Sequence, residues 1–163
     1  MTRFDVTDID TNAVRIIDGE DALITLRSDI KDAGPLYCYT YLIDVVFWHE
    51  LMTPHTDHSE IYVLTDHRQR PLANQLVIEN KRTHFWTWAT NRMLHEKTFI
   101  LPSGGVVWIG SQNLTRGSWT LSKNRAVRIH SHSLATQLLN EWLFIRAMAR
   151  PVLPIAQTDS NEY

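Results

Sequence analysis

The chain has 163 residues, of which 44% are hydrophobic and 21% are charged, and its formal net charge is −2. This composition excludes a disordered chain, and the net charge argues against a general nucleic-acid-binding protein. No apolar run reaches the roughly 20 residues of a membrane helix, the N-terminus has no apolar secretory signal, and Cys38 is the only cysteine. We expect one cytoplasmic domain over residues 1–163, with its core at about 13–150, a short tail at 151–163, no membrane segment and no intramolecular disulfide.

The hydrophobic pattern alternates between strand and helix along the chain. In chain order it predicts a strand at 13–17, a helix at 20–33, a strand at 36–43, a helix at 44–52, a loop at 53–59, a strand at 60–66, a helix at 70–80, strands at 83–89, 95–101, 106–110 and 125–129, and a helix at 133–149. Asp18 is a candidate N-cap for the first helix, and Gly34-Pro35 stops it. Pro102-Ser103-Gly104-Gly105 joins two apolar runs as a β-hairpin. The fold class is therefore α/β, a sandwich in which helices flank one mixed β-sheet.

Charge is distributed unevenly along the sequence. Residues 1–60 hold twelve acidic side chains against four basic ones, whereas residues 80–140 hold eight basic side chains against Glu96 alone. A basic region of this kind can attract an anionic substrate. The alternative is that the two segments pair with each other inside one domain, and the sequence leaves both interpretations open.

Three histidines lie close together in the segment HELMTPHTDH, namely His49, His55 and His58. The segment is not the H-E-x-x-H pattern of zinc enzymes, because Thr53 stands where the second histidine would be. We therefore expect an exposed polar loop rather than a metal site at these three histidines. We also expect no cofactor.

The hairpin carries the residues that best indicate chemistry. Strand periodicity places His95 and Lys97 on one face, one pleat apart. Because the second strand returns antiparallel, Ser111 and Asn113 arrive near the start of the first. A lysine charge, an asparagine amide and the backbone N–H groups before a possible helix at 113–119 suit the oxygens of a phosphodiester. A histidine beside them can act as a nucleophile or as a proton shuttle.

The segments His95-Glu96-Lys97 and Gly110-Ser111-Gln112-Asn113 resemble the H-x-K and G-S-x-N signature of the phospholipase D superfamily. The resemblance extends over about 13–149, and its single motif is most similar to the small bacterial nucleases of that superfamily. It implies a phospholipase D-like sandwich and a metal-independent phosphodiesterase. In this family one histidine attacks phosphorus to give a phosphohistidine, a second protonates the leaving oxygen, and water then releases the product.

The resemblance also implies an assembly and a set of roles. Because the chain has one motif, it implies a homodimer in which two copies of His95 complete one active site. Lys97 and Asn113 would hold the phosphoryl oxygens, and Ser111 would orient the site. Independently of the resemblance, Trp119 is a candidate to stack a base, the alternative being a tryptophan of the core or of a dimer interface. The nearby cations are candidates to contact phosphates, the alternative being an ordinary solvated rim. The full set expected to bind nucleic acid is Gly110, Thr115, Arg116, Trp119, Lys123, Asn124 and Arg125.

Two positions depart from the family pattern. Pro102 stands where the fuller motif has an aspartate, and Asn124 stands at about the position of a glutamate that holds the histidine ring. An amide can accept a hydrogen bond from the ring N–H, but it stabilises an imidazolium less than a carboxylate does.

The sequence favours a nuclease and leaves open whether DNA or RNA is the substrate. One alternative is a lipid-directed phospholipase D, which ranks lower because the sequence offers no amphipathic membrane helix. The other is a degenerate, non-catalytic nucleic-acid-binding protein of the same fold, and Asn124 in place of the family glutamate motivates it.

Overall fold

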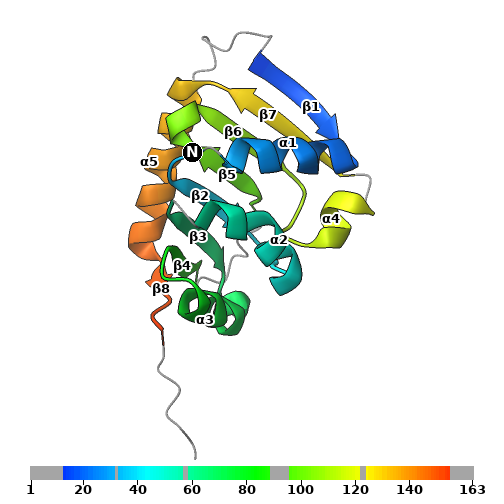
Figure 1. The fold of residues 1–163 in the computed structure, drawn as a ribbon. Helices are drawn as coiled ribbons and strands as arrows, with labels where there is room; N and C mark the ends of the chain where they lie inside the picture. The colour runs from blue at the N-terminus through cyan, green and yellow to red at the C-terminus, as the bar shows by residue number, and fades with distance from the viewer. Residues whose placement is uncertain (1–12, 32, 57–58, 89–95, 122–123, 155–163) are drawn as a thin grey trace, which may run out of the picture.

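The computed structural model describes residues 13–31, 33–56, 59–88, 96–121 and 124–154. The described residues form one eight-stranded sheet with helices on both faces (Figure 1), which confirms the expected α/β sandwich. The strands are β1 (Val14–Asp18), β2 (Leu36–Thr40), β3 (Ile61–Asp66), β4 (Thr83–Trp88), β5 (Thr98–Leu101), β6 (Val106–Gly110), β7 (Arg125–His130) and β8 (Arg150–Pro151). The helices are α1 (Gly19–Lys31), α2 (Val45–Thr56), α3 (Arg70–Glu79), α4 (Arg116–Thr120) and α5 (His132–Met148), with short 3₁₀ turns η2 (His67–Gln69) and η3 (Pro102–Gly104).

The sheet is mixed, and its strand order is β1-β7-β6-β5-β2-β3-β4-β8. Strands β2, β3 and β4 run parallel to one another, whereas β5, β6, β7 and β1 continue the sheet through antiparallel pairs. As a result the carboxyl ends of β2, β3 and β6 share one edge of the sheet with the amino ends of β5 and β7. We call this the motif edge, and it carries Thr40, Asp66, Lys97, Gly110 and Arg125.

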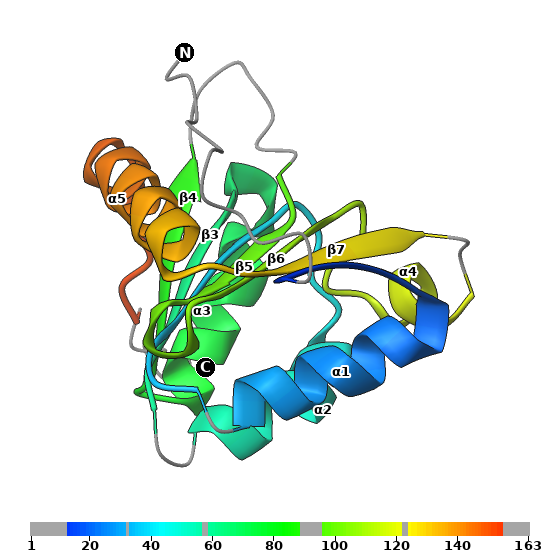
Figure 2. The ribbon, with the colours of Figure 1, turned by 90° about the horizontal axis from the view of Figure 1, so that it is seen from above.

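The two faces of the sheet are covered by different helices. Figure 2 shows α5 on one face and α1, α2 and α3 on the other. Successive strand residues alternate between the two cores, so that Cys38 packs in the larger core on the α1 side and Tyr39 in the smaller core under α5. Cys38 is 0% exposed, and burial raises the pKa of its thiol.

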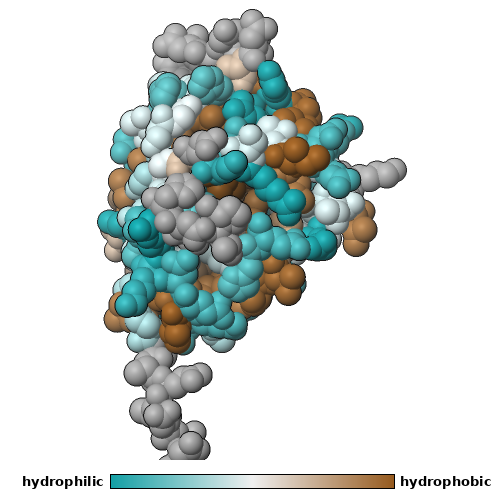
Figure 3. All heavy atoms as spheres, in the orientation of Figure 1, coloured by the Kyte–Doolittle hydropathy of each residue, from teal (hydrophilic) through white to brown (hydrophobic). Residues whose placement is uncertain are grey.

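The outer surface on the α1 side is mostly hydrophilic, with separate hydrophobic patches between the polar side chains (Figure 3). None of the helices in the described ranges is long and apolar enough to cross a bilayer. Within the same ranges, no group of three or more His, Cys, Asp and Glu side chains is arranged to hold a metal ion.

Most of the expected elements are present with shifted ends, and β6 occupies its predicted range. The loop expected at 53–59 is wrong at its start, because α2 continues to Thr56. His55 is therefore buried in this helix rather than exposed, and its Nδ1 lies 2.8 Å from the carbonyl oxygen of Ile30. His58 lies outside the described residues. Strand β5 begins at Thr98, three residues after its predicted start, and β8 was not predicted because two residues give no pattern.

One carboxylate fastens α1 to the sheet. Asp29 Oδ2 accepts hydrogen bonds from Trp108 Nε1 and Arg128 Nε, both at 2.7 Å, and Oδ1 accepts one from Arg128 Nη2 at 2.9 Å. The hydrogen bonds to Asp29 raise the pKa of the mostly buried Arg128. Helix α1 is thereby attached to both β6 and β7.

The same network helps to decide between the two interpretations of the charge asymmetry. Asp29 pairs with Arg128, and Asp18 Oδ1 lies 3.1 Å from Arg125 Nε. Glu50 pairs with Arg116. Each pair joins the acidic first part of the chain to the basic second part. The two segments therefore do neutralise each other within the domain, at least through these three contacts.

We expect Asp29→Ala to lower the free energy of unfolding by about 2–4 kcal/mol, because the Trp108 N–H and the Arg128 guanidinium both lose their acceptor. Urea unfolding followed by far-UV circular dichroism measures the change. Glu20→Ala, at an exposed position in the first turn of the same helix, is the control and should change stability by about 0.5 kcal/mol or less. An effect of Asp29→Ala no larger than that of the control would contradict the assignment.

Candidate active site

Backbone pairing between β5 and β6 brings the two halves of the motif together. Gly110 N–H donates to the carbonyl oxygen of Lys97 at 3.1 Å, and Thr98 pairs with Ile109. The segment Ser111–Asn113 then leaves β6 directly beside Lys97. Lys97 itself precedes β5 rather than lying within it. His95 lies outside the described residues, so its position on the same face as Lys97 stays a prediction.

Lys97 provides a poorly hydrated positive charge at the motif edge. Its side chain is only 6% exposed, and its Nζ lies 5.7 Å from the centroid of the Tyr41 ring. Burial lowers the pKa of Lys97, because removing water disfavours the charged form. A cation in such an environment attracts an anionic oxygen more strongly than one in bulk water does.

Asn113 is fixed by the loop that follows β2. Leu42 N–H donates to Asn113 Oδ1 at 3.3 Å, and Leu114 N–H donates to the carbonyl oxygen of Leu42 at 3.0 Å. Ile43 and Leu114 also form an isolated parallel bridge. Because the amide oxygen of Asn113 serves the backbone, its NH₂ group is the part that can donate to a phosphodiester oxygen. Ser111 is exposed next to it.

Gly110 is required by packing. A methyl group at this position would overlap the amide oxygen of Gln112 and would come within 3.1 Å of the carbonyl oxygen of Arg125. The Gln112 side chain is buried, and with Lys97, Gly110 and Trp119 it helps to line a small cavity below the motif edge. The structure therefore gives Gly110 a role in close packing, which is distinct from the substrate contact predicted for it.

The prediction that Trp119 stacks a base is wrong. Its side chain is 2% exposed, so its ring faces are not available to stack a base. The indole Nε1 donates to the carbonyl oxygen of Asn113 at 2.8 Å, and the ring packs edge-on against Phe99 with centroids 6.3 Å apart. Trp119 thus supports the backbone of the motif from below.

Two further predicted residues contact the short helix α4, which begins three residues later than the helix expected at 113–119. The Thr115 and Ser118 hydroxyl groups are 2.8 Å apart, and Asn124 Nδ2 donates to the carbonyl oxygen of Ser118 at 3.2 Å. A glutamate at position 124 could not donate this bond, which gives a local reason for asparagine there. Contact between Asn124 and the His95 ring stays a prediction.

The cations expected to contact phosphates lie at the rim of the motif edge. Arg116 and Arg125 are both exposed, and each is paired with an acidic side chain, Glu50 and Asp18 respectively. A phosphate bound at either arginine would have to compete with that carboxylate. Lys123 lies outside the described residues.

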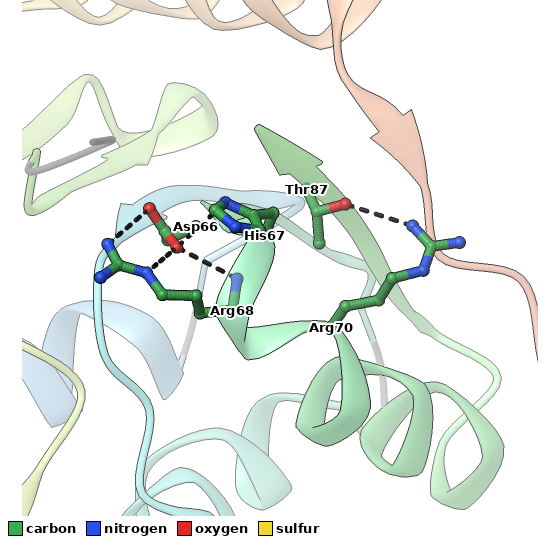
Figure 4. A network of polar contacts seen from close by, with 5 residues as sticks. All are labelled: Asp66, His67, Arg68, Arg70 and Thr87. Atoms are coloured by element: carbon green, nitrogen blue, oxygen red, sulfur yellow. Dashed lines mark hydrogen bonds and ion pairs between the residues drawn. The ribbon is translucent and has the colours of Figure 1, made fainter. Parts of the chain in front are cut away.

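Sequence reasoning missed Tyr41, whose ring lies near Lys97, and the pair Asp66 and Arg68 beside that ring. The Arg68 guanidinium lies 5.1 Å from the centroid of the Tyr41 ring that Lys97 also approaches. Figure 4 shows Arg68 bound to Asp66 at the turn after β3. The available signal was the polar run that begins at Asp66, since residues directly after parallel strands share one edge of a sheet.

Comparison with known proteins gives a family and several similar folds. The family model described as cardiolipin synthase, PLD-like domain, matches residues 36–143. NucT from Helicobacter pylori superposes with a TM-score of 0.70 at 12% identity, over 84% of this chain and 97% of its own. Nuc from Salmonella typhimurium, a phospholipase D family member, superposes with a TM-score of 0.67 at 18% identity, over 85% of this chain and 97% of its own. The archaeal chromatin protein TrmBL2 superposes with a TM-score of 0.61 at 10% identity, over 86% of this chain and 55% of its own. No curated protein matches.

We expect Lys97→Met to raise the free energy of unfolding by about 0.5–1 kcal/mol. The lowered pKa means that the ammonium form is less favourable in the folded chain than in the unfolded chain, and methionine keeps the apolar stem without the charge. Urea unfolding at pH 7 measures the difference, with Lys81→Met at an exposed position as the control. Lower stability of the Lys97 variant would show instead that contacts of the ammonium outweigh its desolvation.

Proposed function

This chain belongs to the phospholipase D-like family, and on that premise we propose that it is a nuclease that cleaves phosphodiester bonds without a metal ion. The family assignment rests on a model that matches more than half of the chain. The single observation that carries the proposal is the pairing of Gly110 with Lys97, which sets a buried lysine beside the Ser111–Asn113 segment. This arrangement supports binding of a phosphate group at the motif edge.

The proposed reaction has two steps. In the first, an imidazole nitrogen of His95 attacks phosphorus, the bond from phosphorus to the leaving oxygen breaks, and that oxygen takes a proton from the second copy of His95. In the second, a water oxygen attacks the phosphohistidine, the P–N bond breaks, and the second histidine receives the proton of the water. Lys97 and the Asn113 amide stabilise the charge on the non-bridging oxygens in both steps.

Nucleic acid is the substrate class that we propose. The motif resembles that of the small single-motif bacterial nucleases, and the fold matches almost the whole length of NucT and Nuc. TrmBL2, which has a novel mode of DNA binding, shares the fold as well. The single motif also supports a homodimer, because one copy of the chain provides one of the two histidines that the reaction uses.

The first test is hydrolysis of single-stranded DNA, duplex DNA and RNA in EDTA, comparing the wild type with His95→Ala. We expect the wild type to cleave at least one polymer, and the variant to lose activity by a factor of about 10³ or more. Equal cleavage by both proteins would contradict the role of His95.

Failure of the wild type to cleave any polymer would contradict the nuclease proposal itself. Hydrolysis of phospholipid vesicles would then favour the lipid-directed alternative. Binding of DNA without turnover would favour the non-catalytic one.

The homodimer is tested by sedimentation velocity over a range of concentrations. We expect a species of twice the chain mass at micromolar concentration, and specific activity that falls on dilution in step with the dimer fraction. Full specific activity in a sample that sediments as a monomer would contradict both the assembly and the use of two histidines.

A further inference from the structure

We propose that Arg68 binds the phosphate next to the scissile one, so that the site selects a polymer over an isolated phosphodiester. This inference rests on the proposed nuclease function and assigns a residue outside the motif to it. It is carried by three observations: the strand register that sets Arg68 near Lys97, the aromatic ring that the two cations share, and the buried carboxylate that orients the guanidinium.

Strand register places the relevant residues side by side. Thr40 of β2 pairs with Thr65 of β3, and Tyr39 pairs with Thr98 of β5. Lys97 precedes Thr98 and therefore lies opposite Thr40, whereas Tyr41 follows Thr40 and lies level with Asp66. The three residues thus come from neighbouring chain segments at the motif edge, with Lys97 one residue out of line with the other two. The β3 turn is also tied to the β2 loop, because Ile43 N–H donates to Gln69 Oε1 at 3.3 Å.

Tyr41 holds both cations around one ring. Arg68 Cζ lies 5.1 Å from the ring centroid and Lys97 Nζ lies 5.7 Å from it. The negative potential of an aromatic face attracts cations at such distances. Both positive charges therefore lie beside the same side chain at the motif edge. Because Lys97 is nearly buried while the Arg68 side chain is 51% exposed, Arg68 is the one placed toward solvent.

Asp66 orients the Arg68 side chain from below. Asp66 is 2% exposed, and its Oδ1 accepts hydrogen bonds from Arg68 Nε at 2.7 Å and from the Arg68 backbone N–H at 3.0 Å. Its Oδ2 accepts from Arg68 Nη2 at 3.2 Å. The carboxylate thus engages one side of the planar guanidinium, and Nη1 is directed away from it. A side chain held in this way loses little conformational freedom when it binds an anion.

Arg70 shows what a purely structural arginine of the same turn looks like. Its Nη1 donates to Thr87 Oγ1 at 3.2 Å and its Nη2 donates to the carbonyl oxygen of Pro151 at 3.4 Å. Figure 4 shows it turned toward β4, away from Asp66 and Arg68. Arg70 therefore provides a matched control, with the same charge and a neighbouring position but a different direction.

The test measures binding of fluorescent 12-nucleotide DNA and RNA single strands of one sequence by anisotropy at several salt concentrations. In the binding assay every protein, the wild type included, carries His95→Ala so that the strands stay intact, whereas the rates are measured with His95 present. We expect Arg68→Gln to weaken binding about tenfold and to reduce the slope of log K against log salt by roughly 0.7. The ratio of kcat/KM for the 12-mer to that for bis(p-nitrophenyl) phosphate should also fall about tenfold.

Two variants separate this role from structural and long-range effects. Arg68→Gln leaves the buried Asp66 carboxylate without its arginine, so the double variant Asp66→Asn/Arg68→Gln removes both charges and keeps the net charge constant. We expect it to bind as weakly as Arg68→Gln, and we expect Arg70→Gln to bind within twofold of the wild type. Thermal unfolding of each variant checks that the fold is retained.

Each remaining outcome has a definite meaning. Wild-type binding by the double variant would show that the Asp66–Arg68 pair is structural only, and would overturn the inference. Equal weakening by Arg70→Gln would show a general charge effect and would also overturn it. A wild type that binds neither strand overturns the inference together with the nuclease proposal. A wild type that cleaves while Arg68→Gln binds and cleaves normally overturns the inference alone.

Discussion

The antiparallel register of β5 and β6 is the constraint on which the candidate site depends. A slip of one residue would turn Lys97 to the other face of the sheet and would separate it from Gly110. The register is held on both faces, because the Phe99–Trp108 pair lies in the larger core and the Ile100–Val107 pair in the smaller one. It is also held at the turn, where Gly105 adopts a φ of 61° that favours glycine.

The rest of the motif edge is assembled around this hairpin by contacts that are distant in sequence. The loop after β2 holds Asn113 by backbone hydrogen bonds, and Trp119 holds the carbonyl oxygen of the same residue. The turn after β3 supplies Asp66 and Arg68. On the far side of the larger core, Asp29 attaches α1 to β6 and β7. A mixed sheet makes this possible, since it brings the ends of parallel and antiparallel strands to one edge.

The structural features that could be predicted from the sequence are those that local sequence patterns determine. The hairpin, the range of β6 and the meeting of its two strands at Lys97 and Gly110 follow from apolar periodicity and the Pro-Ser-Gly-Gly turn, and the structure confirms them. Residues whose roles depend on tertiary contacts were missed or misassigned. Trp119 looked like a stacking residue, because sequence does not show which side of a short helix is buried. Tyr41 and Arg68 become neighbours of Lys97 only through the order of β5, β2 and β3.

The burial of Cys38 makes the chain a convenient scaffold for spectroscopic labels. Since the thiol is fully enclosed and its pKa is raised, maleimide reagents will not modify it while the domain is folded. A cysteine introduced at the exposed Ser111 or Leu121 would then be the reactive thiol of the folded protein, without removal of the natural one. The rate at which Cys38 itself is labelled then measures global opening of the domain, because the central strand β2 must leave both cores before the reagent can reach the thiol.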